Sequence, residues 1–252
     1  MAGMFTEERA IWLYRHYLWL ELNLPKRPSA ARSAFVLPTK KFFPDGYTGD
    51  HASAEAVFRR VMDLMGMSDW PCKFAQRHAR EKELQADLSR SGILGESSSR
   101  GAAGTFSVPE RKEVLITYST SLLNNPLALV STLAHELCHY LLATVRNEPP
   151  ATWKELEPLT DLSAVLEGFG VFLCNTAFQF SQWTSHDRQG WGYERKGYLT
   201  EAELGFSLAI FSVRNRLDAK IAAQALKSNP REVFCDALDY IADLEREGKY
   251  AP

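Results

Sequence analysis

The stretch that most constrains the fold is STLAHELCHYLL at residues 131–142. It places His135 and His139 four residues apart, with Glu136 directly after the first histidine. Leucine, alanine and cysteine fill most of the other positions, so a helix here is apolar nearly all round and has to be buried. Two histidines and a glutamate inside a buried helix cost free energy unless something pairs with them. The rest of the chain must therefore supply a partner for these polar side chains.

The spacing of the three polar residues favours a metal as that partner. Residues four apart on a helix lie one turn apart on the same face, so His135 and His139 can both direct a ring nitrogen at one ion. Glu136 lies about 100° further round the helix, where it can reach a water molecule on that ion. Because the H-E-x-x-H spacing suits zinc hydrolysis, we interpret the two histidines as zinc ligands. The alternative is an ordinary helix with two coincidental histidines.

A catalytic zinc ion has three protein ligands, so the two histidines leave it one short. The segment 155–162 offers three carboxylates, those of Glu155, Glu157 and Asp161. Glu157 and Asp161 are four apart, so one helical face presents both. The distance from His139 to Glu157 allows the first helix to end and a second helix to return beside it. Acidic residues also favour the first turn of a helix without any metal. Asp161 as the direct ligand and, further along, Glu167 stay open as alternatives to Glu157.

H-E-x-x-H followed by E-x-x-x-D at this distance resembles the gluzincin group of zinc metallopeptidases, which have the thermolysin-like architecture. The resemblance covers residues 113–170 and implies that Glu157 is the third zinc ligand. It also implies that Asp161 orients His135 from the second shell of the site, which agrees with the need to fix the tautomer of a ligating histidine. In gluzincins a strand such as EVLITYS, at 113–119, pairs with an extended substrate. More loosely, the chain resembles small bacterial cytosolic zincin-like proteins without an assigned substrate, through four segments taken together: TLAHELCHYLL, EPLTDL, GFGVF and GYLTEAELGFSLA.

Periodicity and capping signals predict a mostly helical α+β chain. We expect helices at about 7–22, 53–65 and 126–144, one long helix that begins near Glu157 and continues through LTDLSAVLEGFGVFLCNTAF, one after Thr200 with Glu203 in a capping box, and a last one over PREVFCDALDYIADLERE. The segments SAFVLP and EVLITYS predict strands, so a short sheet precedes the helix that carries HELCH. Met62, Met65 and Met67 are expected in the core.

The chain is long enough for one large domain or two small ones, at 252 residues with 45% hydrophobic and 24% charged content. Residues 90–104 are small, polar and glycine-rich, which is typical of a flexible loop. We therefore expect an N-terminal mixed helix and strand region over 1–105 that ends in this loop. The resemblance makes 106–252 a zincin-like, metal-binding helical region.

The net charge limits the classes of binding partner that we expect, and the cysteine content indicates the redox state of the compartment. A net charge of −2 gives no electrostatic basis for binding nucleic acid or an anionic membrane. The four cysteines are scattered without a CxxC pair, so a reducing compartment is expected, with Cys138, Cys174 and Cys235 as small apolar filler. Charged residues interrupt the apolar N-terminus, which fits an amphipathic helix better than an export signal. We expect a soluble, cytoplasmic protein.

Two classes of function fit the motif. The first is a Zn²⁺-dependent hydrolase, most simply a peptidase or amidase with a peptide or protein substrate, in which Glu136 is the general base. Its oxyanion needs a second donor besides zinc, and Tyr198 is the first candidate because it follows a glycine in an expected loop. Tyr193, His186 and Arg195 are alternatives. The second class is a non-catalytic metal-containing binding or regulatory domain, which would have no use for Glu136 as a base.

Overall fold

The computed structural model describes residues 6–77, 104–107, 114–150, 152, 155–185 and 198–246. Within these ranges the chain is mostly helical and has one small sheet, which confirms the α+β class. The helices are α1 (Glu7–Asn23), α2 (His51–Leu64), α4 (Pro126–Ala143), α5 (Leu156–Ala164), α6 (Gly170–Ser185), α7 (Glu201–Arg214), α8 (Ala219–Ala225) and α9 (Ser228–Arg246), with a 3₁₀ turn η1 (Thr120–Asn124) and a π-helical turn η3 (Val165–Phe169). In this described part of the chain, every helix is too short or too polar to cross a membrane.

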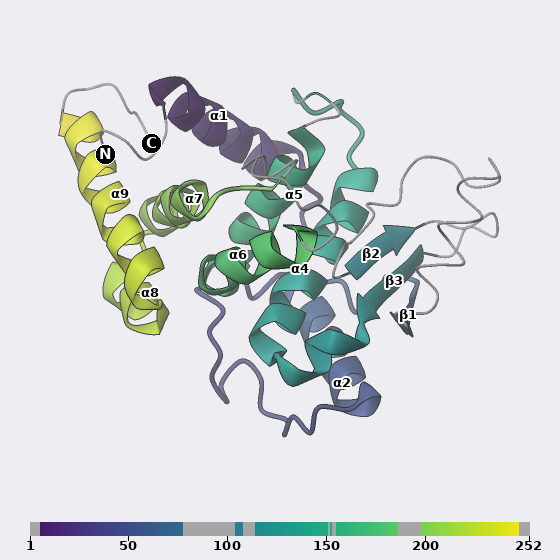
Figure 1. Cartoon of the computed structure of the whole chain (residues 1–252). Coiled ribbons are helices and arrows are strands. Elements are labelled where there is room, and N and C mark those ends of the chain that lie inside the picture. The colour runs from purple at the N-terminus through teal and green to yellow at the C-terminus, as the bar shows by residue number, and fades with distance from the viewer. Residues whose placement is uncertain are drawn as a thin grey trace.

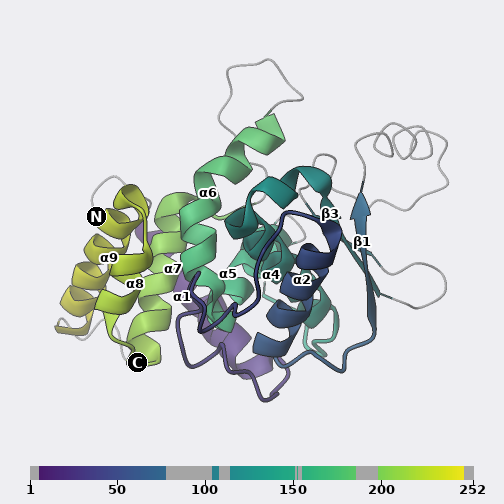
Figure 2. The same ribbon diagram turned by 90° about the horizontal axis from the view of Figure 1, so that it is seen from below.

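The sheet lies at one end of the molecule and α8 and α9 lie at the opposite end, with α4, α5 and α6 between them (Figures 1 and 2). Helix α4 contacts the sheet on one side and α5 and α6 on the other. Helix α7 packs against α6, α9 and α1, and α2 packs against α4. The helix that carries HELCH is therefore central, as its apolar surface requires.

The sheet has the strand order β1 (Cys72–Arg77), β3 (Val114–Ser119) and β2 (Gly104–Ser107). Strand β3 confirms the expected strand EVLITYS, whereas β1 and β2 are not among the expected strands. β1 runs parallel to β3 and β2 runs antiparallel to it, so both hydrogen-bonding edges of β3 are occupied. The expectation that this strand pairs with an extended substrate is therefore wrong, because such a substrate needs a free edge.

The segment SAFVLP at 33–38 is not a strand. Its core, Phe35 and Val36, is buried as expected. However, the Val36 N–H donates to the carbonyl oxygen of Gly168, at 3.0 Å, and not to a neighbouring strand. The apolar run predicted burial correctly, but the hydrogen-bond partner is an interrupted helix elsewhere in the chain.

That interruption divides the long helix expected from Glu157 onward. Gly168 has φ +88°, a left-handed conformation that ends regular helix geometry within η3 between α5 and α6. A Cβ at this position would lie 2.2 Å from the Ala31 carbonyl oxygen, so only glycine allows this approach of the two segments. The expected single helix is therefore α5, η3 and α6.

Capping signals correctly located the starts of α4 and α7, and a glycine correctly marked the end of α2. The Asn125 side chain accepts from the Ala128 N–H at 3.2 Å and Pro126 begins α4. Thr200 and Glu203 form the expected capping box at the start of α7. Gly66 follows α2 with φ +66°. The short helix α8 is an addition to the expected elements.

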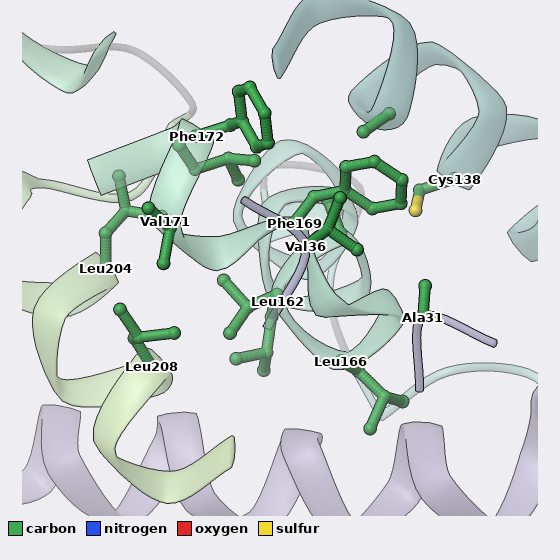
Figure 3. Packing of buried hydrophobic residues seen from close by; sticks show 14 of the residues in the cluster. Ala31, Val36, Cys138, Leu162, Leu166, Phe169, Val171, Phe172, Leu204 and Leu208 are labelled. Atoms are coloured by element: carbon green, nitrogen blue, oxygen red, sulfur yellow. The ribbon is translucent and has the colours of Figure 1, made fainter. Parts of the chain in front are cut away.

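One buried hydrophobic cluster includes residues from both expected regions of the chain. Figure 3 shows part of it, with Cys138 near Phe169, Val36 and Ala31. The three methionines of the α2 region are buried as expected, as are Cys138 and Cys174, but Cys235 is exposed, so its role as core filler is wrong. The boundary at residue 105 stays a prediction. Most of the expected loop at 90–104 lies outside the described residues, and its last residue, Gly104, begins β2.

Candidate metal centre

The candidate site lies where α5 returns beside α4. His135 and His139 are one turn apart on α4, and Glu157 lies in the first turn of α5. His135 Nε2 is 3.1 Å from His139 Nε2 and 3.1 Å from Glu157 Oε2, and His139 Nε2 is 3.5 Å from the same oxygen. Two nitrogens and one oxygen, from two helices, therefore converge on one point, and this is a group that can hold a metal ion.

The three distances fit a tetrahedral ion. Donors about 2.0–2.1 Å from a tetrahedral zinc lie about 3.3–3.4 Å from one another. The observed separations of 3.1, 3.1 and 3.5 Å bracket that value. The donor set of two imidazoles and one carboxylate is also the set that a catalytic zinc site uses, with a fourth position left open. The side chain of Glu157 is 30% exposed, so the site is open on that side.

The other ring nitrogen of each histidine has its own partner. His135 Nδ1 lies 2.8 Å from Asp161 Oδ1. His139 Nδ1 lies 3.4 Å from Thr160 Oγ1. A carboxylate can only accept, so the Nδ1 atom of His135 carries the proton of this bond and its Nε2 is left to face the other donors. Asp161 therefore has the orienting geometry that a ligating histidine needs.

The three converging residues, His135, His139 and Glu157, form a triad in which hydrogen bonds shift the pKa values of His135 and Glu157. Burial alone would lower the pKa of His135, but hydrogen bonds to Asp161 and Glu157 raise it well above its ordinary value. Partial burial would raise the pKa of Glu157, but hydrogen bonds to the two histidines hold it well below its usual range. Both pKa shifts favour positive charge beside the carboxylate of Glu157. A divalent cation bound by the same atoms would supply that charge in place of protons.

Glu136 is buried directly beside the first ligand candidate. Burial raises the pKa of its carboxyl group, and the neighbouring charges of His135 and His139 act to lower it. It is not one of the three converging residues. A buried carboxylate with a raised pKa next to a possible metal position is suited to take a proton from water.

The structure also brings Tyr198 to the site. Its ring centroid lies 5.4 Å from that of His135, and its side chain forms a hydrogen bond with Glu157. Burial raises the pKa of its hydroxyl, and the charges of the nearby carboxylates raise it further, so Tyr198 stays a proton donor. The alternatives His186, Tyr193 and Arg195 lie outside the described residues.

The competing ligand candidates have other partners. Asp161 accepts from His135 through Oδ1 and from the Leu199 N–H through Oδ2, at 2.9 Å, so both of its oxygens are in use. Glu167 is fully buried and pairs with Arg27 and Arg32. Glu155 accepts from the backbone and side chain of Thr152. Glu157 is thus the carboxylate that faces both histidines.

Two neighbours of the site are not indicated by the zinc motif. Thr160 is fully buried and contacts His139; the signal in the sequence is its place three residues after Glu157, on the same helical face. Phe106 on β2 stacks near His139, with ring centroids 6.3 Å apart. No pattern in the sequence indicates Phe106, because β2 is only four residues long and its position depends on pairing with β3.

Comparison with known proteins gives no relatives. No protein-family model matches the chain, and no curated protein or solved structure shows significant similarity to it. The functional argument therefore depends on the geometry of the site.

Proposed function

We propose that the chain is a zinc-dependent hydrolase of the gluzincin type, a peptidase or amidase with a peptide or protein substrate. The observation that carries the proposal is the convergence of His135, His139 and Glu157 at the spacing of a tetrahedral ion, beside the buried carboxylate of Glu136. A zinc ion held by these three residues supplies Lewis acidity, which polarises a carbonyl group and makes water more acidic. A purely structural zinc site uses four protein ligands, and this group has three.

In the proposed reaction, Glu136 acts as the general base. One of its oxygens takes a proton from water while the water oxygen forms a bond to the substrate carbonyl carbon. The carbon–nitrogen bond then breaks, and Glu136 passes the proton to the leaving nitrogen. The Tyr198 hydroxyl donates a hydrogen bond to the oxyanion that develops on the carbonyl oxygen. Its raised pKa supports this role, since the hydroxyl keeps its proton.

The proposal includes a zincin-like fold. A short sheet packs against the HELCH helix, and a second helix returns to bring a carboxylate to the histidines, which supports this fold. Because β3 is paired on both sides, an extended substrate would have to add to an edge strand. We favour β2 over β1, because Phe106 on β2 lies next to His139. The proposed cytoplasmic location has support from the free state of the described cysteines.

The test of the base is Glu136→Gln, which keeps the size of the side chain and removes the base. Purified wild type and mutant should both contain about one zinc ion per chain. The mutant should hydrolyse any peptide that the wild type cleaves from a broad library about 10²–10⁴ times more slowly. Glu155→Gln is the matched control, because this carboxylate binds Thr152 and lies outside the triad. It should retain wild-type activity.

The opposite result would favour a metal-containing binding or regulatory domain. In that case the wild type holds zinc but cleaves no member of the library, and Glu136→Gln changes no measured property. A wild-type activity that survives Glu136→Gln would reject the mechanism and leave the zinc site intact.

A further inference from the structure

Three side chains on one face of α5 contact the two histidines of the candidate site. Glu157, Thr160 and Asp161 are at positions i, i+3 and i+4, so they point to the same side of the helix. Glu157 approaches the Nε2 atoms of both histidines, Asp161 meets His135 Nδ1, and Thr160 meets His139 Nδ1. The contact of Thr160 is the one that neither the zinc motif nor the resemblance assigns.

The direction of the Thr160 contact follows from its other bond. The Thr160 hydroxyl lies 2.8 Å from the Leu156 carbonyl oxygen, which can only accept, so its single proton is used there. Its oxygen therefore presents lone pairs to His139 Nδ1, 3.4 Å away. For this contact to be a hydrogen bond, Nδ1 must carry a proton, and in the neutral ring Nε2 is then free of one.

The burial of Thr160 and the exposure of His139 indicate that this hydrogen bond affects the orientation of the His139 ring. Thr160 is fully buried, so water has no access to its side chain. His139 is the more exposed of the two histidines, with 24% of its side chain accessible against 7% for His135. Its ring therefore depends more on a fixed partner for its orientation. A neutral hydroxyl at 3.4 Å is a weaker acceptor than the carboxylate at 2.8 Å on His135.

From this geometry we infer that Thr160 is a positioning residue for the metal site: it holds His139 in the tautomer and orientation that present Nε2 to the ion. The inference depends on the proposed metal site and adds one residue to it. It also makes α5 the element that supplies a ligand and orients both histidines. Groups that orient metal-ligating histidines typically change metal affinity about 10–100-fold, and a neutral hydroxyl belongs at the lower end.

The test compares Thr160→Val with Thr160→Ser. Valine keeps the branched shape and removes the acceptor, whereas serine keeps the hydroxyl. Zinc affinity, measured by competition with a chromogenic chelator, should fall about tenfold in Thr160→Val and stay at the wild-type value in Thr160→Ser. The visible spectrum of the cobalt-substituted protein should change in the valine variant alone, because it reports the ligand field at His139.

Ser163→Ala is the matched control. Ser163 is on the same helix, is fully buried and donates in the same way to the carbonyl four residues earlier, that of Leu159, at 2.8 Å. It should bind zinc as the wild type does. If Thr160→Val does not fold, Thr160→Ala removes the same acceptor without the branched methyls and carries the same expectation.

Two outcomes would overturn the inference. One is a folded Thr160→Val or Thr160→Ala protein with wild-type zinc affinity and cobalt spectrum. The other is an equal loss of affinity in Ser163→Ala, which would indicate a general effect on α5. Failure of the metal site itself is distinct: the wild type then binds no zinc, or His139→Ala binds it as tightly as the wild type.

Discussion

Two glutamates on consecutive helical segments, the partly exposed Glu157 on α5 and the buried Glu167 on η3, have different kinds of partner. Glu167 pairs with two arginines, through Arg27 Nη2 at 2.6 Å and Arg32 Nη2 at 2.7 Å. Glu157 meets the nitrogens of two histidines, at 3.1 and 3.5 Å. Arginine is always charged, whereas imidazole nitrogens can release their protons and bind a metal. The carboxylate of Glu167 is thus neutralised by fixed side-chain charges, whereas the donor atoms around Glu157 could accept a metal cation.

The side chains of the two glutamates also differ in their exposure to solvent. The side chain of Glu167 is 0% exposed and that of Glu157 is 30% exposed. A ligand can therefore reach Glu157 and not Glu167. The Glu167 cluster connects the segment around Arg27 and Arg32 to the interrupted helix, which indicates a structural role. A carboxylate in a buried helix is thus a ligand candidate only when its partners can give up their protons.

The largest expected difference between the two clusters is zinc binding. His139→Ala and Glu157→Ala should each abolish stoichiometric zinc binding, because each removes one of three ligands. For the wild type, zinc at about 1,000 times its dissociation constant should raise the free energy of unfolding by about 4 kcal/mol. Elemental analysis and urea denaturation with and without zinc measure both effects. If the wild type contains no zinc after metal-supplemented expression, Glu157 is not a zinc ligand and the two glutamates do not differ in metal binding.

The second prediction concerns the arginine cluster. Glu167→Gln should lower the free energy of unfolding by about 3–5 kcal/mol, because it leaves two arginine charges without their buried anionic partner. Urea denaturation without metal measures this loss. Glu55→Gln is the control, since Glu55 pairs with Arg59 on the exposed surface of α2, and it should cost less than about 1 kcal/mol. Equal effects of the two substitutions would show that burial of Glu167 has no energetic consequence.

The third prediction concerns the glycine next to Glu167. Gly168→Ala should lower the free energy of unfolding by at least about 2 kcal/mol, because an alanine is strained at this positive φ and its Cβ would meet the Ala31 carbonyl oxygen. Thermal or urea denaturation measures the change. The control is Gly46→Ala, where a Cβ has no neighbour within 4 Å, and stability there should be unchanged or slightly higher. A stable Gly168→Ala protein would mean that the interruption between α5 and α6 tolerates a side chain.

The two clusters also differ in how far the sequence predicts them. His135, His139, Glu157 and Asp161 are recognisable because two spacings of four residues place them on two helical faces, and both spacings are local. Helix caps at Asn125 and Thr200 are local too. These features depend on neighbours a few residues away, so the spacing of residues in the sequence is sufficient to predict them.

The arginine cluster has no such local signal. Arg32 and Glu167 are 135 residues apart in sequence, and their pairing depends on the approach that Gly168 allows. The same tertiary contact gives SAFVLP a helix carbonyl as its partner, although its apolar character predicts a strand. The pairing of β1 with β3 joins residues as distant as Cys72 and Val114. Such contacts depend on how distant segments pack together, and the local periodicity of the sequence does not predict this packing.

The smallest expected effect tests which carboxylate, Glu157 or Asp161, is the ligand in the candidate metal site. Asp161 accepts two hydrogen bonds, from His135 Nδ1 and from the Leu199 N–H, at 2.8 and 2.9 Å. An asparagine in its place has a single acceptor oxygen, so its amide group would face one of these two donors. Asp161→Asn should therefore weaken zinc binding about 10–100-fold, or about 1.4–2.7 kcal/mol, through poorer orientation of His135.

Glu157→Ala should have a far larger effect than Asp161→Asn in the same competition assay, because it removes a donor atom of the ion. Asp218→Asn is the control: Asp218 caps α8 by accepting from the Lys220 N–H, a role that asparagine fills equally well, so zinc affinity should not change. An empty site in Asp161→Asn, together with wild-type binding in Glu157→Ala, would reverse the two roles. Because both carboxylates lie on one face of α5, that reversal would change which of them binds the ion and leave the two histidines as its partners.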